Sequence, residues 1–316
     1  MSSDPQHSAY EVLVCTYNGE RYIADQLESI LKQQPAPAGV LVSDDGSTDQ
    51  TRTIVKQIAA SSSISVALID GPGKGVIQNV LTALPKTTAP YVFLADQDDI
   101  WLDNKASLFY EKMRTDDAPH LIFSDAWVWH PESNEKTSFW KLDQLNPRNA
   151  SDPRRLAFHN TVQGASACVN RALIMAMQNT ACHSDIVMHD WWLALIASGT
   201  GLIEPIAEPT LLYRQHNDNQ VGAREQLGGK QRNPLLRKFK TSLASIRQAV
   251  AFANQFEGQL KTEYRPFFNA LSHSLTKGPH RRFWFILKFF PRKRNCFITL
   301  ALWGMIMAQR VDTPPL

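Results

Sequence analysis

Three carboxylates within four residues, Asp96, Asp98 and Asp99, follow an apolar run at residues 91–95. Like charges this close repel one another, so the group stays ionised only beside a cation or strong hydrogen-bond donors. Mg²⁺ and Mn²⁺ take oxygen ligands and are commonly shared between carboxylates and substrate phosphates. The alternative is a solvated acidic turn in which Asp99 or Asp103 caps the next helix. The position directly after a predicted strand favours the metal-binding interpretation.

A second acidic pair, Asp44 and Asp45, ends another short apolar run. These carboxylates can accept hydrogen bonds from a ribose hydroxyl or from the imide N–H of uracil or thymine. The alternative is a tight turn in which Ser47 caps the following helix. Lys74, in the run GPGKG, is either a phosphate ligand or part of a surface turn. That run lacks the GxxxxGK[ST] spacing, and no GxGxxG follows the first strand, which argues against a P-loop or a Rossmann dinucleotide site.

The elements that position these residues alternate along the first 130 residues. Short β-rich runs are separated by segments whose apolar residues recur at helical spacing. We expect strands at residues 11–16, 40–43, 64–69, 91–95 and 121–124. This alternation predicts a mostly parallel sheet with helices on both faces, in which ligands bind at the carboxyl ends of the strands. Residues 16–18, 44–45 and 96–99 all follow predicted strands, so we expect them to share one crevice.

The pattern is less regular beyond about residue 158. A strand at 162–169, a helix beginning at 189 and a strand at 210–214 are expected. Residues 217–234 are polar and glycine-rich and are typical of a loop or linker. We therefore predict a catalytic domain at residues 1–229 and a helical, basic region at 230–316.

The motifs VCTYNGERYIADQLESIL, VSDDGSTDQT, LADQDDIWLDNK, QGASACVNRAL, MHDWW and YRQHNDNQVG occur in this order over residues 10–224. Together they resemble the inverting glycosyltransferases of family 2, and especially bacterial rhamnosyltransferase-type members. The resemblance implies the GT-A fold, a Rossmann-like α/β architecture that binds nucleoside-diphosphate sugars. It also implies a divalent metal, Mn²⁺ or Mg²⁺.

The resemblance assigns the donor site first. Thr16, Tyr17 and Asn18 match the family's first nucleotide-binding loop, and Asp44 and Asp45 match the carboxylates near the base and ribose.

Asp96 and Asp98 match the family's DxD motif, with Asp98 the first choice as metal ligand and Asp96 contacting the metal or the nucleotide. Asp190 stands where the family places its catalytic base, usually within an acidic pair. Here His189 precedes it, and the role of His189 is left open. Asp190 would take a proton from the acceptor hydroxyl as that oxygen attacks the anomeric carbon. From the residues alone, Asp190 is also a candidate N-cap of the following helix.

The late YRQH motif resembles the family's segment near the diphosphate. It makes Arg214 a candidate phosphate ligand and His216 a candidate third metal ligand, and the glycine-rich loop after it could close over the donor. Trp101, Trp191 and Trp192 are candidates for stacking on the acceptor, with burial in the core as the alternative.

Charge is divided unevenly along the chain. Residues 1–229 carry a net charge of −10, whereas residues 230–310 carry +14. Aromatic and basic residues interleave in the second part, which ends in an apolar run at 297–308. That run is too short to span a bilayer. The segment is either an interfacial helix on an anionic membrane or a subdomain whose apolar face packs on the catalytic domain. Nucleic-acid binding is not expected, since no recognised module is present.

The four cysteines have no paired spacing, and the first residues lack the pattern of a secretory signal. We therefore expect a cytoplasmic enzyme, peripheral at the inner membrane. It would transfer rhamnose or another deoxyhexose from a dTDP-sugar, or a sugar from a UDP-sugar, to a lipid-linked or polysaccharide acceptor. The alternatives are a metal-dependent nucleotidyltransferase and a non-catalytic GT-A-like scaffold at the membrane.

Overall fold

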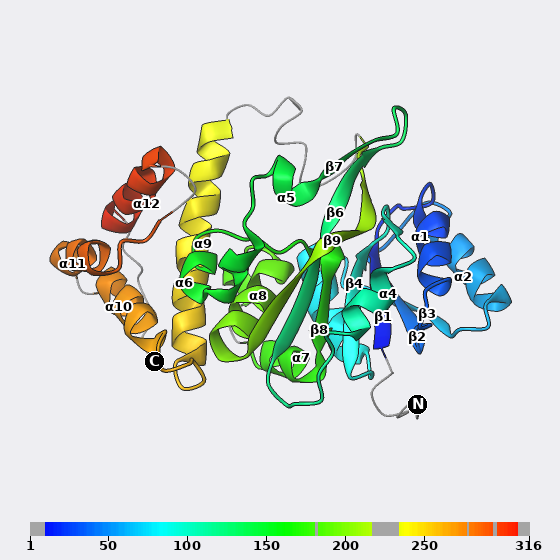
Figure 1. Ribbon diagram of the computed structural model, residues 1–316, viewed down its shortest axis with the longest axis horizontal. Coiled ribbons are helices and arrows are strands. Elements are labelled where there is room, and N and C mark those ends of the chain that lie inside the picture. The colour runs from blue at the N-terminus through cyan, green and yellow to red at the C-terminus, as the bar shows by residue number, and fades with distance from the viewer. Residues whose placement is uncertain (1–9, 181–182, 217–233, 277, 293–295, 309–316) are drawn as a thin grey trace.

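A computed structural model describes residues 10–180, 183–216, 234–276, 278–292 and 296–308 of the chain (Figure 1). Its strands are β1 (Tyr10–Thr16), β2 (Gly39–Asp44), β3 (Val66–Asp70), β4 (Tyr91–Asp96), β5 (Ile100–Trp101), β6 (His120–His130), β7 (Glu135–Ser138), β8 (Ala167–Asn170) and β9 (Leu202–Arg214). Its helices are α1 (Ile23–Leu31), α2 (Thr51–Ser61), α3 (Val76–Ala83), α4 (Lys105–Tyr110), α5 (Phe139–Leu142), α6 (Pro153–Leu156), α7 (Arg171–Gln178), α8 (His189–Thr200), α9 (Pro234–Phe256), α10 (Arg265–Thr276), α11 (Pro279–Phe289) and α12 (Cys296–Ala308).

One sheet runs through the first two thirds of the chain, in the order β3-β2-β1-β4-β8-β6-β9-β5, with β7 paired to β6. Strands β1 to β4 are parallel, as expected, because helical crossovers return the chain to the same edge. Beyond β4 the sheet is mixed, which corrects the prediction of a mostly parallel sheet. There β6 turns directly into β7 and only short helical segments precede β8, which pairs antiparallel with both β4 and β6.

The carboxyl ends of the central strands lie side by side. The register pairs Thr16 of β1 with Asp44 of β2, and Cys15 of β1 with Asp96 of β4. The predicted convergence of the three polar strand ends at one edge of the sheet is therefore confirmed.

The C-terminal helices share a hydrophobic core with the sheet domain. Helix α8 is almost entirely buried, and its Trp192 ring meets Phe252 of α9 edge-on, with ring centroids 6.1 Å apart. Figure 1 shows α9 beside α6 and α8, with α10, α11 and α12 on its far side. The basic C-terminal region therefore packs on the catalytic domain through α9, as one of its two predicted alternatives states. The expected boundary at 229/230 and the glycine-rich loop lie outside the described residues.

The apolar run near the C-terminus forms α12, whose Leu302, Met305 and Ile306 pack into the same core. Within the described residues, no helix combines the length and apolarity needed to cross a membrane.

The packing of α9 predicts that it is integral to the fold. Replacing Phe252 by Ala leaves a cavity between α8 and α9 and should lower the free energy of unfolding by about 3–5 kcal/mol. Met175→Ala, at an exposed position on α7, is the control and should cost no more than about 0.5 kcal/mol. Denaturant unfolding of both variants measures the difference; equal costs would mean that α9 is only loosely attached.

Candidate functional site

The segment Asp96–Asp99, called the DQDD segment, comprises the last residue of β4 and the three residues that follow it. Burial and the negative charges of Asp98 and Asp190 raise the pKa of Asp96 to about 7. The charge effect places Asp190, from the start of α8, near the end of β4. Asp98 accepts or shares a hydrogen bond with His216, with Oδ2 and Nε2 2.8 Å apart.

The third carboxylate, Asp99, is directed into the protein. Its Oδ1 accepts a hydrogen bond from the Arg214 backbone N–H at 3.3 Å, and burial together with the charges of Asp98 and Asp96 raises its pKa well above the ordinary value. Lys105 is fully buried, and its charge acts on Asp99. Its ammonium group donates to the Ala165 carbonyl at 3.1 Å and lies 4.7 Å from the Trp101 ring centroid. Burial lowers the pKa of Lys105 to about 7. Neither Asp99 nor Asp103 caps α4, whose N-terminus lacks a side-chain cap.

Gln97 ties the DQDD segment to the loop after β1. Its Oε1 accepts from the Thr16 hydroxyl at 2.5 Å and from the Tyr17 N–H at 2.8 Å, and its Nε2 donates to the Tyr17 carbonyl at 3.1 Å. A Cβ on Gly19 would lie 2.3 Å from Gln97 Oε1, so any larger residue there would displace the Gln97 amide from these hydrogen bonds. The Tyr17 ring is half exposed, which leaves it free to stack on a planar ligand. Sequence reasoning missed Gln97, although its place between Asp96 and Asp98 was a signal.

Asn18 joins the loops after β1 and β2. It adopts a left-handed conformation with φ 48°, which Asn tolerates better than most residues. Its N–H donates to Ser47 Oγ at 2.8 Å, and its Oδ1 accepts from the Thr48 N–H at 2.8 Å. Ser47 is therefore used between the loops and does not cap α2, which begins at Thr51; the capping alternative is wrong.

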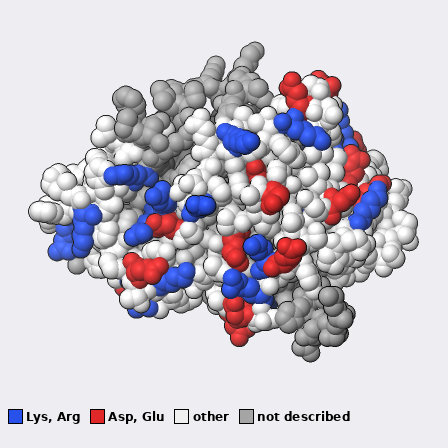
Figure 2. Space-filling view, viewed as in Figure 1, with Lys and Arg blue, Asp and Glu red and all other residues white. Residues whose placement is uncertain are grey.

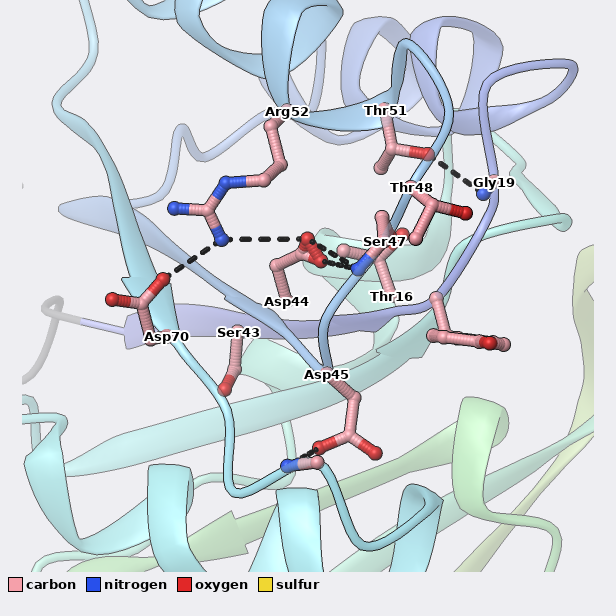
Figure 3. A network of polar contacts seen from close by, with 12 residues as sticks. Thr16, Gly19, Ser43, Asp44, Asp45, Ser47, Thr48, Thr51, Arg52 and Asp70 are labelled. Carbon is pink, nitrogen blue, oxygen red and sulfur yellow. Dashed lines mark hydrogen bonds and ion pairs between the residues drawn. The ribbon is translucent and has the colours of Figure 1, made fainter.

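Figure 3 shows Asp44 and Asp45 pointing in opposite directions from the end of β2. Asp44 accepts from the Ser47 N–H at 2.9 Å and meets Arg52, which also pairs with Asp70. Both aspartates are buried, and each oxygen that accepts one hydrogen bond retains a second lone pair.

Asp45 organises the loop that carries Lys74. Its two carboxylate oxygens accept from the N–H groups of Gly73 at 2.7 Å and Gly75 at 2.6 Å, and both glycines have positive φ. Lys74, between them, is exposed at the surface of this turn. The loop is thus a turn wrapped around a carboxylate, with its one cation directed outward.

Arg214 braces the DQDD segment from β9. Its Nε donates to the Asp98 carbonyl at 2.9 Å and its guanidinium pairs with Asp25 at 3.0 Å. The guanidinium carbon lies 4.8 Å from the Tyr22 ring centroid and 5.0 Å from that of Trp129. Arg214 is accordingly engaged by protein groups on several sides, and its immediate effect is to fix the backbone that carries Asp98.

Asp190 lies in the first turn of α8 and does not cap it, because the N-cap position is Met188. Its carboxylate accepts hydrogen bonds from the Gly164 N–H at 3.1 Å, from the Trp191 N–H at 2.6 Å and from the Asn160 side chain. Burial raises its pKa, and these donors and His189 oppose the rise.

His189 is buried beside the same glycine. A Cβ on Gly164 would lie 2.8 Å from His189 Nε2, so the two segments touch closely. Burial lowers the pKa of His189, which favours the neutral imidazole, and its Nδ1 is buried without a hydrogen-bond partner among the described residues.

The three tryptophans proposed to stack on an acceptor are buried. Trp101 lies against Phe93 and Lys105, Trp191 donates to the Leu156 carbonyl at 2.5 Å, and Trp192 belongs to the core between α8 and α9. The acceptor-stacking prediction is therefore wrong for all three, and the core alternative holds.

The carboxylates and His216 supply oxygen and imidazole donors suited to a divalent metal. No group of three or more His, Cys, Asp or Glu side chains within the described part of the chain is already arranged as a metal site. Mg²⁺-type sites commonly use one or two carboxylates and complete the shell with water and substrate phosphates. Asp98 and Asp96, whose proton a cation would displace, fit that pattern together with His216.

Buried Lys105 yields a stability prediction. Lys105→Met removes a buried cation whose charge acts on the Asp99 carboxyl group, together with its hydrogen bond to the Ala165 carbonyl. We expect the free energy of unfolding to fall by about 2–4 kcal/mol. Lys112→Met, at an exposed position just after α4, is the matched control and should stay within about 0.5 kcal/mol. If urea unfolding finds the same cost for both, Lys105 has no special role.

Known proteins with similar sequences carry related activities. The chain is 28% identical to the dTDP-rhamnosyl transferase RfbG of Shigella flexneri over 264 residues, covering 78% of this chain and 88% of that protein. It is 34% identical over 97 residues to the Escherichia coli UDP-Glc:alpha-D-GlcNAc-diphosphoundecaprenol beta-1,3-glucosyltransferase WfgD, covering 31% of this chain and 38% of that one.

Solved structures show the same fold at lower identity. Residues 1–349 of Staphylococcus aureus TarS superpose with a TM-score of 0.54 at 16% identity, covering 95% of this chain and 81% of that one. The mannosyltransferase PcManGT from Pyrobaculum calidifontis, solved with GDP-Man and Mn²⁺, gives a TM-score of 0.50 at 18% identity over 93% of this chain and 78% of that one.

The family profile "Glycosyl transferase family 2" matches residues 11–173, the part of the chain that contains the DQDD segment and the loops after β1 and β2. This match covers half of the chain, and the GT-A-like sheet agrees with it. The protein is a member of glycosyltransferase family 2.

Proposed function

We propose that the crevice binds a nucleoside-diphosphate sugar and transfers the sugar with inversion to an acceptor hydroxyl. The observation that carries this proposal is the position of Asp190. It is a buried carboxylate whose charge contributes to the raised pKa of Asp96 at the end of β4. A base beside the donor carboxylates, contributed by a different element, is what a single displacement from the opposite face requires.

The donor would occupy the edge formed by the loops after β1, β2 and β4. Tyr17 would stack on the base, and Asp44 and Asp45 would use their remaining lone pairs toward the base and ribose. Lys74, Thr16 and the DQDD segment would line the diphosphate side. Asp98 would hold a divalent metal together with Asp96 and His216. The mannosyltransferase PcManGT, which has a similar fold, was solved with Mn²⁺ bound. The bound metal would supply charge that stabilises the departing diphosphate.

Asp190 would accept the proton of the attacking hydroxyl. The hydrogen bonds from Gly164 and Trp191 fix its carboxylate, and burial raises its pKa, which makes it a stronger base than an exposed aspartate. A raised pKa also means that the carboxylate is protonated, and transfer lost, at a higher pH than for an ordinary aspartate. Neutral His189 would pack behind Asp190 and keep a second negative charge out of this position.

The relatives guide the choice of sugar and acceptor. RfbG is named as a dTDP-rhamnosyl transferase, and it matches this chain over most of its length. We infer a deoxyhexose, rhamnose first, from a dTDP-sugar, and a lipid-linked or polysaccharide acceptor used in cell-surface glycan synthesis. The enzyme would act at the cytoplasmic face of the membrane as a peripheral protein.

Removing the base tests the mechanism. Asp190→Asn preserves size and hydrogen-bond capacity but cannot take up the proton, so release of nucleoside diphosphate from the donor should fall about 10²–10⁴-fold while donor binding is retained. Asp185→Asn, five residues earlier, is the control and should turn over like the wild type. Wild-type turnover by Asp190→Asn would refute the assignment, and loss of donor binding would place Asp190 in the donor site.

The pKa of Asp96 near 7 gives the metal site a pH dependence. A metal binds the deprotonated carboxylate, so Mn²⁺ binding should release a proton at pH 6.5 and release almost none at pH 8.5. The apparent affinity should fall up to about tenfold for each pH unit below 7. Calorimetry in two buffers of different ionisation enthalpy measures the released proton. Asp96→Asn should abolish the effect, whereas equal binding and no proton release at either pH would contradict it.

A further inference from the structure

The end of the molecule formed by α10, α11 and α12 presents apolar side chains to solvent. Phe283, Trp284 and Leu287 of α11 are 52%, 66% and 52% exposed, and Leu300 of α12 is 57% exposed. Figure 1 places these helices at the end opposite α1 and α2, beyond α9. Large exposed aromatic groups clustered on one helix usually mark an interaction surface.

Basic side chains border this apolar face. Arg281 and Lys288 of α11 and Arg292 just after it are exposed, and none of them pairs with Asp or Glu within the described residues. The sequence contains no Asp or Glu at all between residues 264 and 311. Figure 2 shows Lys and Arg atoms at the outer edge of this end of the molecule. The surface is therefore both apolar and uniformly positive, which fits an anionic partner.

A shallow pocket of about 230 Å³ lies between α10 and α11 and opens among the same residues. His273 of α10 and Arg281 and Lys288 of α11 supply its polar lining, and Trp284 and Phe289 supply aromatic walls. A pocket with cationic groups beside aromatic walls suits a group that is charged at one end and apolar at the other.

The inward face of α11 holds this surface in place. Arg282, unlike its neighbour Arg281, is buried, and it donates to the Met307 carbonyl of α12 at 2.8 Å and to the Ser274 carbonyl of α10 at 3.4 Å. A cation at the carboxyl ends of two helices is favoured by their dipoles. With Phe285 and Ile286 in the core as well, α11 has one face committed to the protein and the other left uncovered.

We propose that the exposed face of α11, defined by Arg281, Phe283, Trp284, Leu287 and Lys288, docks the enzyme on an anionic phospholipid surface. The aromatic groups enter the headgroup region, where Trp is favoured, and the basic groups contact lipid phosphates. This assignment differs from the apolar run at 297–308, in which Leu302, Met305 and Ile306 are buried. Only the purpose of this docking depends on the proposed function: it would bring the donor site to an acceptor at a membrane.

Vesicle co-sedimentation of the full chain tests the proposal. The protein should bind vesicles that contain phosphatidylglycerol and bind pure phosphatidylcholine vesicles at least tenfold more weakly, with binding to the former weakened by salt. The double variant Trp284→Ala/Leu287→Ala and the pair Arg281→Gln/Lys288→Gln should each lower binding at least tenfold. The matched controls Met175→Ala and Lys112→Gln change exposed residues elsewhere and should bind like the wild type.

Several results would overturn the docking assignment. These are failure to bind phosphatidylglycerol vesicles, α11 variants that bind as well as the wild type, or a wild-type oligomer in size-exclusion chromatography that the Trp284→Ala/Leu287→Ala variant converts to monomer. Donor turnover measured without vesicles should be the same in all variants, because α11 lies at the end of the molecule opposite α1 and α2, away from the loops after β1 and β2 (Figure 1). Vesicle binding without donor turnover would refute the proposed function alone.

Discussion

Mutual repulsion among carboxylates at one edge of the sheet is the constraint on which this site depends. Asp96, Asp98 and Asp99 follow β4, and Asp190 approaches from α8. Water is partly excluded there, so the protein keeps this charge in place with groups from other elements. Arg214 fixes the DQDD segment by a hydrogen bond to the Asp98 carbonyl, and the positive charge of buried Lys105 acts on Asp99. The pKa of Asp96, raised to about 7, reflects the repulsion that remains, and a divalent cation held by Asp96 and Asp98 would relieve it.

Much of this arrangement could be predicted from the sequence, because it depends on local patterns. Apolar runs followed by polar residues located the ends of β1, β2 and β4, and parallel crossovers bring such ends together. The sheet beyond β4 could not be predicted in the same way. Strand direction there follows from how β8 inserts between β4 and β6, a tertiary choice with no local signature.

The side-chain errors have a common physical cause. Trp101 and Trp192 have an amphipathic character that suits either a binding surface or a core, and only the packing of α4, α8 and α9 decides between them. Lys105 belongs to a short helix, yet it is fully buried because the Ala165 carbonyl and an aromatic cluster receive its ammonium group. The partners of Arg214, the Asp98 carbonyl and the Asp25 carboxylate, lie far away in sequence and could not be foreseen, while its expected contact with a phosphate stays a prediction.

The central claim is that this crevice binds a nucleoside-diphosphate sugar together with a divalent metal. The most direct measurement is the shift in unfolding temperature with UDP-, GDP- and dTDP-sugars, each with and without Mn²⁺, because a ligand that binds only the folded state stabilises it. The account predicts that sugars of one nucleotide raise the unfolding temperature in Mn²⁺ and do so weakly or not at all without it. An unfolding temperature that no nucleotide sugar raises, with or without the metal, would contradict it.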